Sequence, residues 1–303
     1  VVNGLKGARI AMLGARPIAF NTVRYSEKLL QKHGISVQTI DFSEIIFKAM
    51  HYNDAEKVVA KIKEIREYGS VPAWISDEVM EKQAKLCLVI DEAIEDLQCD
   101  ASTVQCWDSV ENNYGCATCL AMSMMGDNGK PSACESDVTG ALSMLAAWLA
   151  AGTAPALMDW NNNIREERNA CVSLHCSNFP KSFFLNDVEI ECLDVLGSTL
   201  GKENCFGACK GHVAAGDMTF IRLTTDDQRG TVKAYLGEGV FRDEVIPTKG
   251  GVANCYIENL QNLLRYVCEN GYEHHVCFVR GHVADILEEA LTKYMGIPVY
   301  RHR

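Results

Sequence analysis

Two hydrophobic periods alternate along the first half of the chain. Short apolar runs of strand length stand at residues 8–14, 35–40 and 103–107. Apolar residues recur at helical spacing over residues 22–33, 55–68 and 76–96, and the first two of these helices end just before a glycine. This alternation of strands and helices predicts an α/β fold with a doubly wound, Rossmann-like parallel sheet. Ligand sites of such sheets lie at the carboxyl ends of the strands.

The pattern changes near residue 150. An apolar stretch over residues 141–158 is interrupted by Gly152 and Pro155, which predicts a buried helix followed by a strand. Further short strands are predicted at residues 219–223, 231–236 and 252–257, with a hairpin-like connection at 226–230. The chain ends with a predicted helix, strand and helix at residues 257–270, 275–279 and 283–294. We therefore predict an α/β domain over residues 1–150 and a C-terminal mixed domain over residues 151–303.

Two carboxylates stand where predicted elements meet. Glu135 lies at or just before the start of the helix that precedes Gly152, and Asp159 follows the short strand at 155–158. This placement lets the two side chains converge from adjoining elements. Carboxylates are hard ligands that suit Mn²⁺ or Mg²⁺, and they also exchange protons. The alternative, in which Glu135 caps a helix and Asp159 is a turn residue, remains open on composition alone.

Several segments resemble L-fucose isomerase and its relatives. Residues 133–141 (ACESDVTGA) and 157–160 (LMDW) are similar to the paired metal-ligand segments of that family. Residues 14–17 resemble a loop at the end of the family's first strand, and residues 237–239 resemble a barrel turn. Residues 272–278 resemble the histidine-bearing strand near the family's C-terminus. The similar segments occur in the family's order along nearly the whole chain.

The resemblance implies both a fold and a reaction. The implied fold is an α/β domain followed by a C-terminal mixed domain with a β-barrel. The implied function is a metal-dependent aldose–ketose isomerase that acts on an open-chain sugar through an enediol intermediate. Glu135 and Asp159 would bind Mn²⁺, or another divalent cation such as Co²⁺ or Mg²⁺, and would carry the transferred proton. In this scheme the cation stabilises the enediolate that forms beside the sugar carbonyl.

Histidine is the third ligand that such a site requires. His274 and His275 are consecutive on a predicted strand, so we expect only one of them to face the pocket. The related L-arabinose isomerases carry a His-His pair whose second member binds metal, which favours His275. His175 resembles an additional ligand of that branch, and two roles remain open for it: metal ligand or hydrogen-bond donor to the substrate. We expect His33, His51 and His302 to be surface residues.

Two residues are candidates for contacting the sugar. Arg16 follows the first strand. Trp107 and Trp160 could each stack on the apolar face of a sugar, and Trp160 is favoured over Trp107 because it adjoins Asp159. A zinc site made from Cys116, Cys119, Cys205 and Cys209 is less favoured, because the two cysteine pairs differ in spacing. NAD binding is also disfavoured, because the first strand is not followed by the full set of glycines that a dinucleotide site needs.

Composition narrows the set of partners. The net charge of −11 argues against a nucleic-acid partner, which would require a basic face. No apolar run reaches the roughly 20 residues that a membrane span needs. Fourteen cysteines are scattered through apolar segments, for example Cys87, Cys192, Cys268 and Cys277, as buried hydrophobic residues would be. These features predict a cytoplasmic protein.

Quaternary structure and substrate are left open by the sequence. Isomerases of this type assemble as trimers or hexamers, so a homo-oligomer is expected. The family's extra N-terminal domain has no counterpart here, because the chain opens directly on the predicted sheet, and we interpret it as an abbreviated member or a fragment. Two alternatives remain: a sugar-binding protein without catalysis, and another metal enzyme, an epimerase or aldolase, on the same scaffold.

Overall fold

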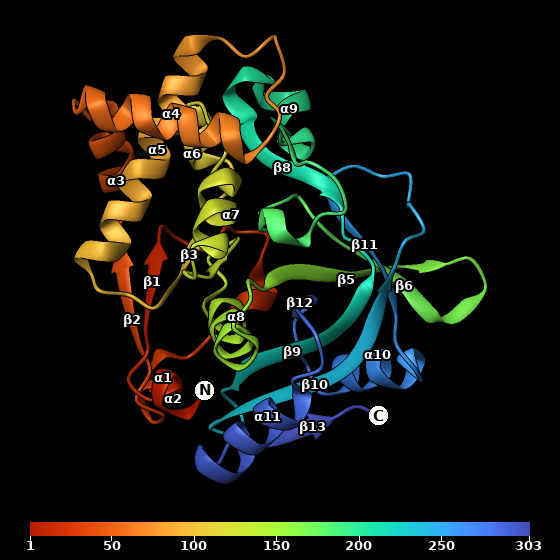
Figure 1. Ribbon diagram of the computed structural model, residues 1–303. Coiled ribbons are helices and arrows are strands. Elements are labelled where there is room, and N and C mark those ends of the chain that lie inside the picture. The colour runs from red at the N-terminus through yellow and green to blue at the C-terminus, as the bar shows by residue number, and fades with distance from the viewer.

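The computed structural model describes residues 1–303. Its first half contains a four-stranded parallel sheet in the order β2-β1-β3-β4 (Figure 1). These strands are β1 (Arg9–Leu13), β2 (Ser36–Ile40), β3 (Ala101–Val104) and β4 (Ser132–Ala133). The chain passes from β1 to β2 on one side and then to β3 on the other, so the strand order reverses between β1 and β3. The predicted parallel α/β sheet is confirmed.

The helices of this half follow the predicted pattern in part. They are α1 (Val2–Leu5), α2 (Glu27–Gln31), α3 (Phe42–Met50), α4 (Ala55–Tyr68), α5 (Asp77–Asp96), α6 (Ser109–Asn113), α7 (Cys119–Asp127) and α8 (Val138–Ala151). The helices predicted at 55–68 and 76–96 are confirmed. Side chains of Asp54 and Ser76 cap them by accepting hydrogen bonds from the amides of Lys57 and Val79.

The helix predicted over 22–33 was too long. Only a 3-10 turn at Asn21–Val23 and the short α2 form, and Arg24 and Ser26 between them are extended. The amide of Ser26 donates to the hydroxyl of Thr225 in the second half of the chain, which local periodicity cannot reveal. The strand predicted at 103–107 lies slightly earlier, as β3, and helix α3 was not predicted.

The second half closes a six-stranded β-barrel. The strand order is β10-β9-β12-β5-β6-β11, and β11 pairs back onto β10. These strands are β5 (Ala156–Ile164), β6 (Glu167–His175), β9 (Gly216–Asp226), β10 (Thr231–Arg242), β11 (Gly251–Tyr256) and β12 (His275–Arg280). Outside the barrel, β13 (Val299–Arg301) pairs with β10, and β8 (Phe206–His212) and β7 (Glu189–Cys192) continue from β11. The barrel that the resemblance implied is confirmed.

Short helices cover this half. They are α9 (Asp194–Leu200), α10 (Leu260–Glu269) and α11 (Ala284–Glu289), with a π-helical turn at Ala290–Tyr294 and 3-10 turns at Lys181–Phe183 and Glu203–Cys205. No helix of the chain combines the length and hydropathy that a membrane crossing would require.

Helix α8 lies between the parallel sheet and the barrel (Figure 1). It packs against β1 and β3 on one side and against β9 and β12 on the other. Its first ten residues, Val138 to Ala147, are all buried, which explains why the helix is apolar on every face. The N-terminal end of α8 therefore lies where the two halves of the molecule meet.

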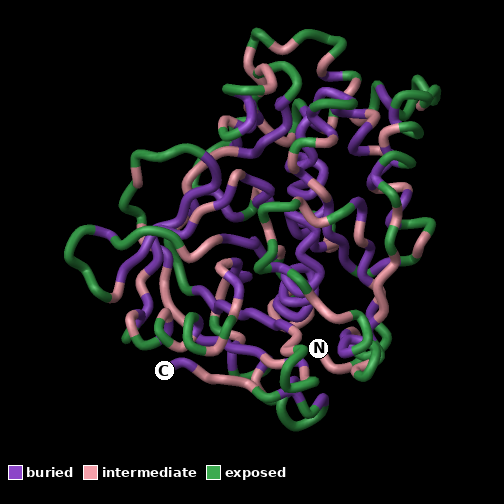
Figure 2. The backbone as a smooth tube through the Cα atoms, turned by 180° about the vertical axis from the view of Figure 1, so that it is seen from behind, coloured by how far each residue is buried: buried purple, intermediate pink, exposed green.

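Buried residues fill the middle of the molecule, and exposed residues follow the outer loops (Figure 2). The largest cluster contains 57 buried residues and draws on both halves, for example Leu13 of β1 and Phe278 of β12. A second cluster of 28 residues surrounds α8. Because the hydrophobic core is continuous across residue 150, the division into domains 1–150 and 151–303 remains a prediction.

Candidate active site

Three of the predicted ligands come together beside the start of α8. Glu135 stands on the turn between β4 and α8, while Asp159 and His275 face each other as partners of the antiparallel β5–β12 pair. The Nε2 atom of His275 lies 3.1 Å from Oε2 of Glu135 and 3.5 Å from Oδ1 of Asp159. The sheet end and the barrel wall thus contribute to one cluster.

Strand alternation determines which side chains reach this cluster. Leu157 and Cys277 belong to the core cluster around α8, so the alternate residues Asp159 and His275 also face α8. Met158 and Phe278, on the opposite face, belong to the other core cluster. The site is therefore built on the outer wall of the barrel, where α8 covers it.

The backbone at Glu135 adopts an unusual conformation. Glu135 and Ser136 have φ angles of 64° and 54°, in the left-handed region that non-glycine residues rarely occupy. Such residues cost roughly 1–3 kcal/mol each and persist only where the surroundings hold them. Here the hydroxyl of Ser136 donates to the carbonyl of Ala15 at 3.2 Å, and its amide donates to the carbonyl of Val104 at 3.3 Å. The strained turn aims Glu135 at the histidine.

Asp137 connects the helix to the histidine. One oxygen of its carboxylate accepts from the amide of Gly140 at 2.8 Å, which caps α8, and the other lies 2.8 Å from Nδ1 of His275. The Nη2 atom of Arg222 donates to the same carboxylate at 2.9 Å. Burial alone would raise the pKa of Asp137, but the charges of Arg222 and His275 outweigh it and hold that pKa well below its usual range. Asp137 is therefore a carboxylate.

Arg222 is a fully buried cation that joins three elements. Its side chain has no exposed surface, and besides Asp137 it donates to Oε2 of Glu273 at 3.1 Å and to the hydroxyl of Thr139 at 2.8 Å. A Cβ atom at Gly140 would collide with the Asp137 carboxylate and lie 3.0 Å from Arg222. Residue 140 must therefore be glycine for the carboxylate of Asp137 and the guanidinium of Arg222 to lie this close to the backbone of α8.

The cluster has the donor set of a metal centre. Oε2 of Glu135, Oδ1 of Asp159 and Nε2 of His275 are buried, and none has a hydrogen-bond partner of normal geometry. Because Nδ1 of His275 contacts Asp137, its Nε2 is the nitrogen free to bind a cation, as in carboxylate–histidine–metal arrangements. Two carboxylate oxygens and an imidazole suit Mn²⁺ and similar divalent ions. The residues present fit such an ion.

The carboxylates of the cluster also stabilise positive charge on the neighbouring histidines. Burial lowers the pKa of His275, but the hydrogen bond to Asp137 and the nearby carboxylates of Glu135 and Asp159 outweigh it and raise that pKa to about 9. The pKa of His175 is likewise raised, because the nearby charges of Cys176, Asp159 and Glu135 outweigh its burial. Several buried carboxylates therefore stabilise a cation at this point, whether a proton or a metal ion.

Two further histidines, His175 and His274, also approach the cluster. Nε2 of His175, at the end of β6, lies 3.9 Å from Oε1 of Glu135. Nε2 of His274 lies 3.7 Å from Oδ1 of Asp159, and its Nδ1 lies 3.2 Å from the hydroxyl of Thr22. Both consecutive histidines therefore approach the carboxylates, and the expectation that only one of them faces the pocket stays a prediction. Strand β12 begins at His275, so strict alternation does not apply to His274.

A pocket of about 430 Å³ opens beside this cluster. Its lining residues are Phe20, Trp107, Glu135, Asp159, Leu174, His175, Cys176, Leu193, Asp194, Val195, Lys249 and Gly250. Two aromatic rings, Phe20 and Trp107, pack edge to face at 5.5 Å on its wall. The indole Nε1 of Trp107 is buried without a hydrogen-bond partner. The sequence offered Trp107 as well as Trp160 for stacking on a sugar, and Trp160 was favoured because it adjoins Asp159.

The two predicted sugar contacts lie elsewhere. The ring of Trp160 packs edge to face on Phe220 and Phe278, and its indole nitrogen donates to the hydroxyl of Tyr235 at 2.8 Å. Because Asp159 faces α8, its neighbour Trp160 faces the opposite side of the strand, so the structure does not place it in this pocket. Arg16 lines a separate depression near Ser136. The structure therefore does not bring either residue to the cluster.

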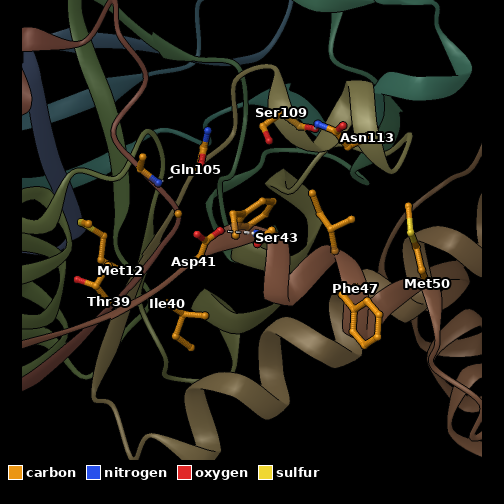
Figure 3. A pocket seen from close by; sticks show the side chains of 14 residues that line it. Met12, Thr39, Ile40, Asp41, Ser43, Phe47, Met50, Gln105, Ser109 and Asn113 are labelled. Carbon is orange, nitrogen blue, oxygen red and sulfur yellow. Dashed lines mark hydrogen bonds between the residues drawn. The ribbon is translucent and has the colours of Figure 1, made fainter.

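A larger pocket, of about 710 Å³, lies at the carboxyl ends of β1, β2 and β3 (Figure 3). Its walls are formed by apolar side chains such as Met12 and Phe47 and by Asp41, whose carboxylate accepts from the amide of Ser43 at 2.9 Å. None of the candidate metal ligands lines it. The carboxylates therefore converge at a neighbouring pocket and not at the largest of these cavities.

Two surface expectations need correction. His302 is buried, and its Nε2 lies 2.7 Å from the carbonyl of Glu258. Cys268 is exposed, whereas it was expected in the core. All fourteen cysteines are free thiols. The four cysteines considered for zinc, Cys116, Cys119, Cys205 and Cys209, are buried but belong to none of the clusters that could hold a metal ion.

Glu111 in α6 is a buried carboxyl whose oxygens have no hydrogen-bond partner. Burial raises its pKa to about 8, above the value of about 4.3 in an unfolded chain. Unfolding therefore releases a proton between these values, and stability falls as the pH rises from about 4 to 8. We expect Glu111→Gln to raise the melting temperature by about 2–6 °C at pH 8 and to change it little at pH 4.5. Calorimetry at both pH values measures the difference.

The exposed Glu166, in the turn between β5 and β6, provides the matched control. Glu166→Gln should leave the melting temperature unchanged at both pH values. An equal shift for Glu111→Gln at pH 4.5 and pH 8 would contradict the assignment of a protonated, buried Glu111.

Comparison with known proteins agrees with this geometry. Residues 173–303 match the family model of the L-fucose isomerase C-terminal domain. The chain is 27% identical over 294 residues, 95% of its length, to sulfoquinovose isomerase of Priestia aryabhattai. It is 24% identical over 303 residues, 98% of its length, to sulfoquinovose isomerase of Alkalicoccus urumqiensis. It spans 63% and 66% of the length of these two relatives.

The matched domain contains both His175 and His275. The α/β sheet that supplies Glu135, the closed barrel and these comparisons agree with a resemblance to the L-fucose isomerase family, whose C-terminal domain is the part that residues 173–303 match.

Proposed function

We propose that this protein is a divalent-metal-dependent aldose–ketose isomerase that acts on an open-chain sugar. One observation carries the proposal: buried oxygens of Glu135 and Asp159 lie 3.1 Å and 3.5 Å from the buried Nε2 of His275 beside a pocket, and none of the three atoms has a hydrogen-bond partner. His175 lies close enough to join them as a fourth ligand or to donate to the substrate. Mn²⁺ is the preferred ion, with Co²⁺ and Mg²⁺ as alternatives.

The roles of the residues follow from their contacts. When bound, a divalent cation would supply Lewis acidity that stabilises the charge of an enediolate. Asp137 holds His275 through Nδ1 and keeps Nε2 directed at the centre. Glu135 and Asp159 lie on the pocket wall, where a carboxylate can remove the proton from C2 of the sugar and return it to C1, while a second proton passes from the C2 hydroxyl to the C1 oxygen. This transfer through an enediol interconverts aldose and ketose.

The substrate class is suggested by the relatives and by the pocket. The two compared relatives act on sulfoquinovose according to their names, so that sugar is the first candidate. Lys249 is the positively charged side chain among the lining residues, and its Nζ lies 3.3 Å from Oδ1 of Asp194 at the pocket rim. A cation at the rim is compatible with a sugar that carries an anionic group.

The aromatic wall yields a prediction about substrate affinity. Trp107→Phe keeps the ring beside Phe20 but removes the buried indole N–H. If that N–H donates to a sugar hydroxyl, its loss should raise KM about fivefold with a small change in kcat, because one neutral hydrogen bond contributes about 1 kcal/mol. Steady-state kinetics measures both constants. Trp160→Phe, in the barrel interior, serves as the control and should leave KM unchanged; an unaltered KM for Trp107→Phe would count against this contact.

A direct assay tests the proposed reaction. The protein is treated with a chelator, supplied with Mn²⁺, Co²⁺ or Mg²⁺, and incubated with sulfoquinovose and a panel of neutral aldoses. Nuclear magnetic resonance then detects ketose formation. We expect turnover only with added metal, and deuterium from heavy water should enter the product if a proton is transferred. Tight metal binding without ketose from any sugar would refute the isomerase and would favour a sugar-binding protein or another metal enzyme.

Assembly is a separate part of the proposal. We expect a trimer or hexamer, as in isomerases of this type, and light scattering coupled to size-exclusion chromatography measures the mass in solution. A monomer would leave the site as described here but would exclude a contribution from neighbouring subunits.

A further inference from the structure

Two cysteines flank the candidate ligands in the sequence. Cys134 directly precedes Glu135, and Cys176 directly follows His175. In the structure the two Sγ atoms, one carboxylate oxygen of Glu135 and one ring nitrogen of His175 all lie within 4.8 Å of one another. Segments that are about 40 residues apart in the chain therefore bring two thiols to the same side of the cluster.

The surroundings of the thiols suit a bound cation. Cys134 has no exposed surface, and its Sγ donates to Sγ of Cys106 at 2.9 Å, which keeps it beside Glu135. Cys176 is half-buried and lines the 430 Å³ pocket, and its Sγ lies 3.5 Å from Nδ1 of His175. The pocket thus provides an entry path to the thiols.

The donor set differs from that of the centre formed by Glu135, Asp159 and His275. Two sulfurs, one nitrogen and one oxygen make a four-ligand set of the kind that Zn²⁺ binds tetrahedrally, with Zn–S distances of about 2.3 Å and Zn–N distances of about 2.0 Å. These bond lengths require ligand atoms roughly 3.3–3.8 Å apart, so small rotations of the side chains would complete the tetrahedron. Thiolates disfavour Mn²⁺ and Mg²⁺, which prefer oxygen ligands.

We propose that Cys134, Cys176, His175 and Glu135 form a second cation site, selective for a thiophilic divalent ion such as Zn²⁺. On binding, the thiols release their protons to solvent, and each sulfur donates an electron pair to the ion. Glu135 belongs to both donor sets and His175 lies beside both, so occupation of the thiol site withdraws Glu135 from the neighbouring centre. Zn²⁺ is therefore an inhibitor that competes with Mn²⁺; this last consequence, unlike the binding itself, rests on the proposed isomerase function.

Cadmium provides a probe of the site that is independent of activity, because Cd²⁺–thiolate bonds absorb in the ultraviolet. Reduced, metal-free protein is titrated with Cd²⁺ and, in parallel, with Zn²⁺ by calorimetry. We expect one tight equivalent with thiolate absorption in the wild type. Cys134→Ser and Cys176→Ser should each weaken it about 100-fold and reduce the absorption. Cys268→Ser, which removes an exposed thiol, is the control and should change neither.

The outcomes separate this site from the isomerase function. If Cys134→Ser does not fold, as judged by circular dichroism, Cys176→Ser on the pocket wall still tests the site. Unchanged Cd²⁺ affinity and absorption in Cys176→Ser would overturn the proposal, whether or not the protein isomerises sugars. If isomerase activity is found, Zn²⁺ should inhibit the wild type at least tenfold more strongly than Cys176→Ser, each relative to its own activity, and equal inhibition would overturn the competitive role.

Discussion

Replacing His275 with alanine is expected to abolish metal binding and to lower kcat/KM at least about a thousandfold, since the proposed reaction would then lose its Lewis acid. The physical reason is the geometry of the ring: Nδ1 contacts Asp137, and Nε2 stands 3.1 Å and 3.5 Å from the two carboxylates. Glu135→Gln should have a similar effect, because an amide oxygen is a neutral and weaker ligand. Metal content by mass spectrometry and ketose formation measure the two losses.

His282→Ala is the matched control for this prediction. His282 is an exposed histidine whose Nε2 lies 3.9 Å from Asp217, and it belongs to none of the metal-binding clusters. Its replacement should leave metal content and activity intact. If Glu135→Gln retains both metal and activity, Glu135 is only part of a helix-capping turn, and the proposed centre is wrong.

Replacing Arg222 with methionine is expected to lower the free energy of unfolding by about 3–5 kcal/mol, because it leaves buried carboxylates without their counter-charge. Arg222 has no exposed surface, and it holds both Asp137 and Glu273. The loss should also disorder the contact between Asp137 and His275, so metal affinity should fall with stability. Denaturant titration measures the first effect and calorimetric metal titration the second.

Arg229→Met tests whether the loss of unfolding free energy in Arg222→Met arises because Arg222 is buried. Arg229 also pairs with an aspartate, Asp226, at 2.9 Å, but most of its side chain is exposed. Exposed ion pairs contribute about 0–1 kcal/mol, so this variant should be nearly as stable as the wild type. A loss below 1 kcal/mol for Arg222→Met would show that the buried network does not stabilise the fold. In that case, combining Asp137→Asn and Glu273→Gln with Arg222→Met would not raise the free energy of unfolding either.

The proposed metal centre draws on both halves of the molecule. The centre uses Glu135 from the end of the parallel sheet and Asp159 and His275 from the barrel wall. Helix α8 connects them, because its N-terminal cap, Asp137, is also the partner of His275. A variant that loosens this helix should therefore affect the site even when it touches no ligand.

The sequence by itself determined the local elements and the two carboxylates. Helices α4 and α5 were predicted correctly because their apolar spacing, caps and terminal signals agree with each other. Glu135 and Asp159 could be placed because each follows or precedes an element with a clear period. The resemblance supplied His275, and the structure places it in contact with both carboxylates.

Only the tertiary structure decided which neighbours meet. Trp160 adjoins Asp159 in sequence, but successive side chains of a strand point to opposite faces, so Trp160 lies inside the barrel. Trp107 lines the pocket from a loop. Arg222 was visible as a lone charge within a predicted apolar strand, yet its partners Asp137 and Glu273 come from distant segments. Periodicity reports which face of an element is apolar. It does not report which faces of different elements pack together, and that packing is what assembles the ligands, the pocket and the thiols.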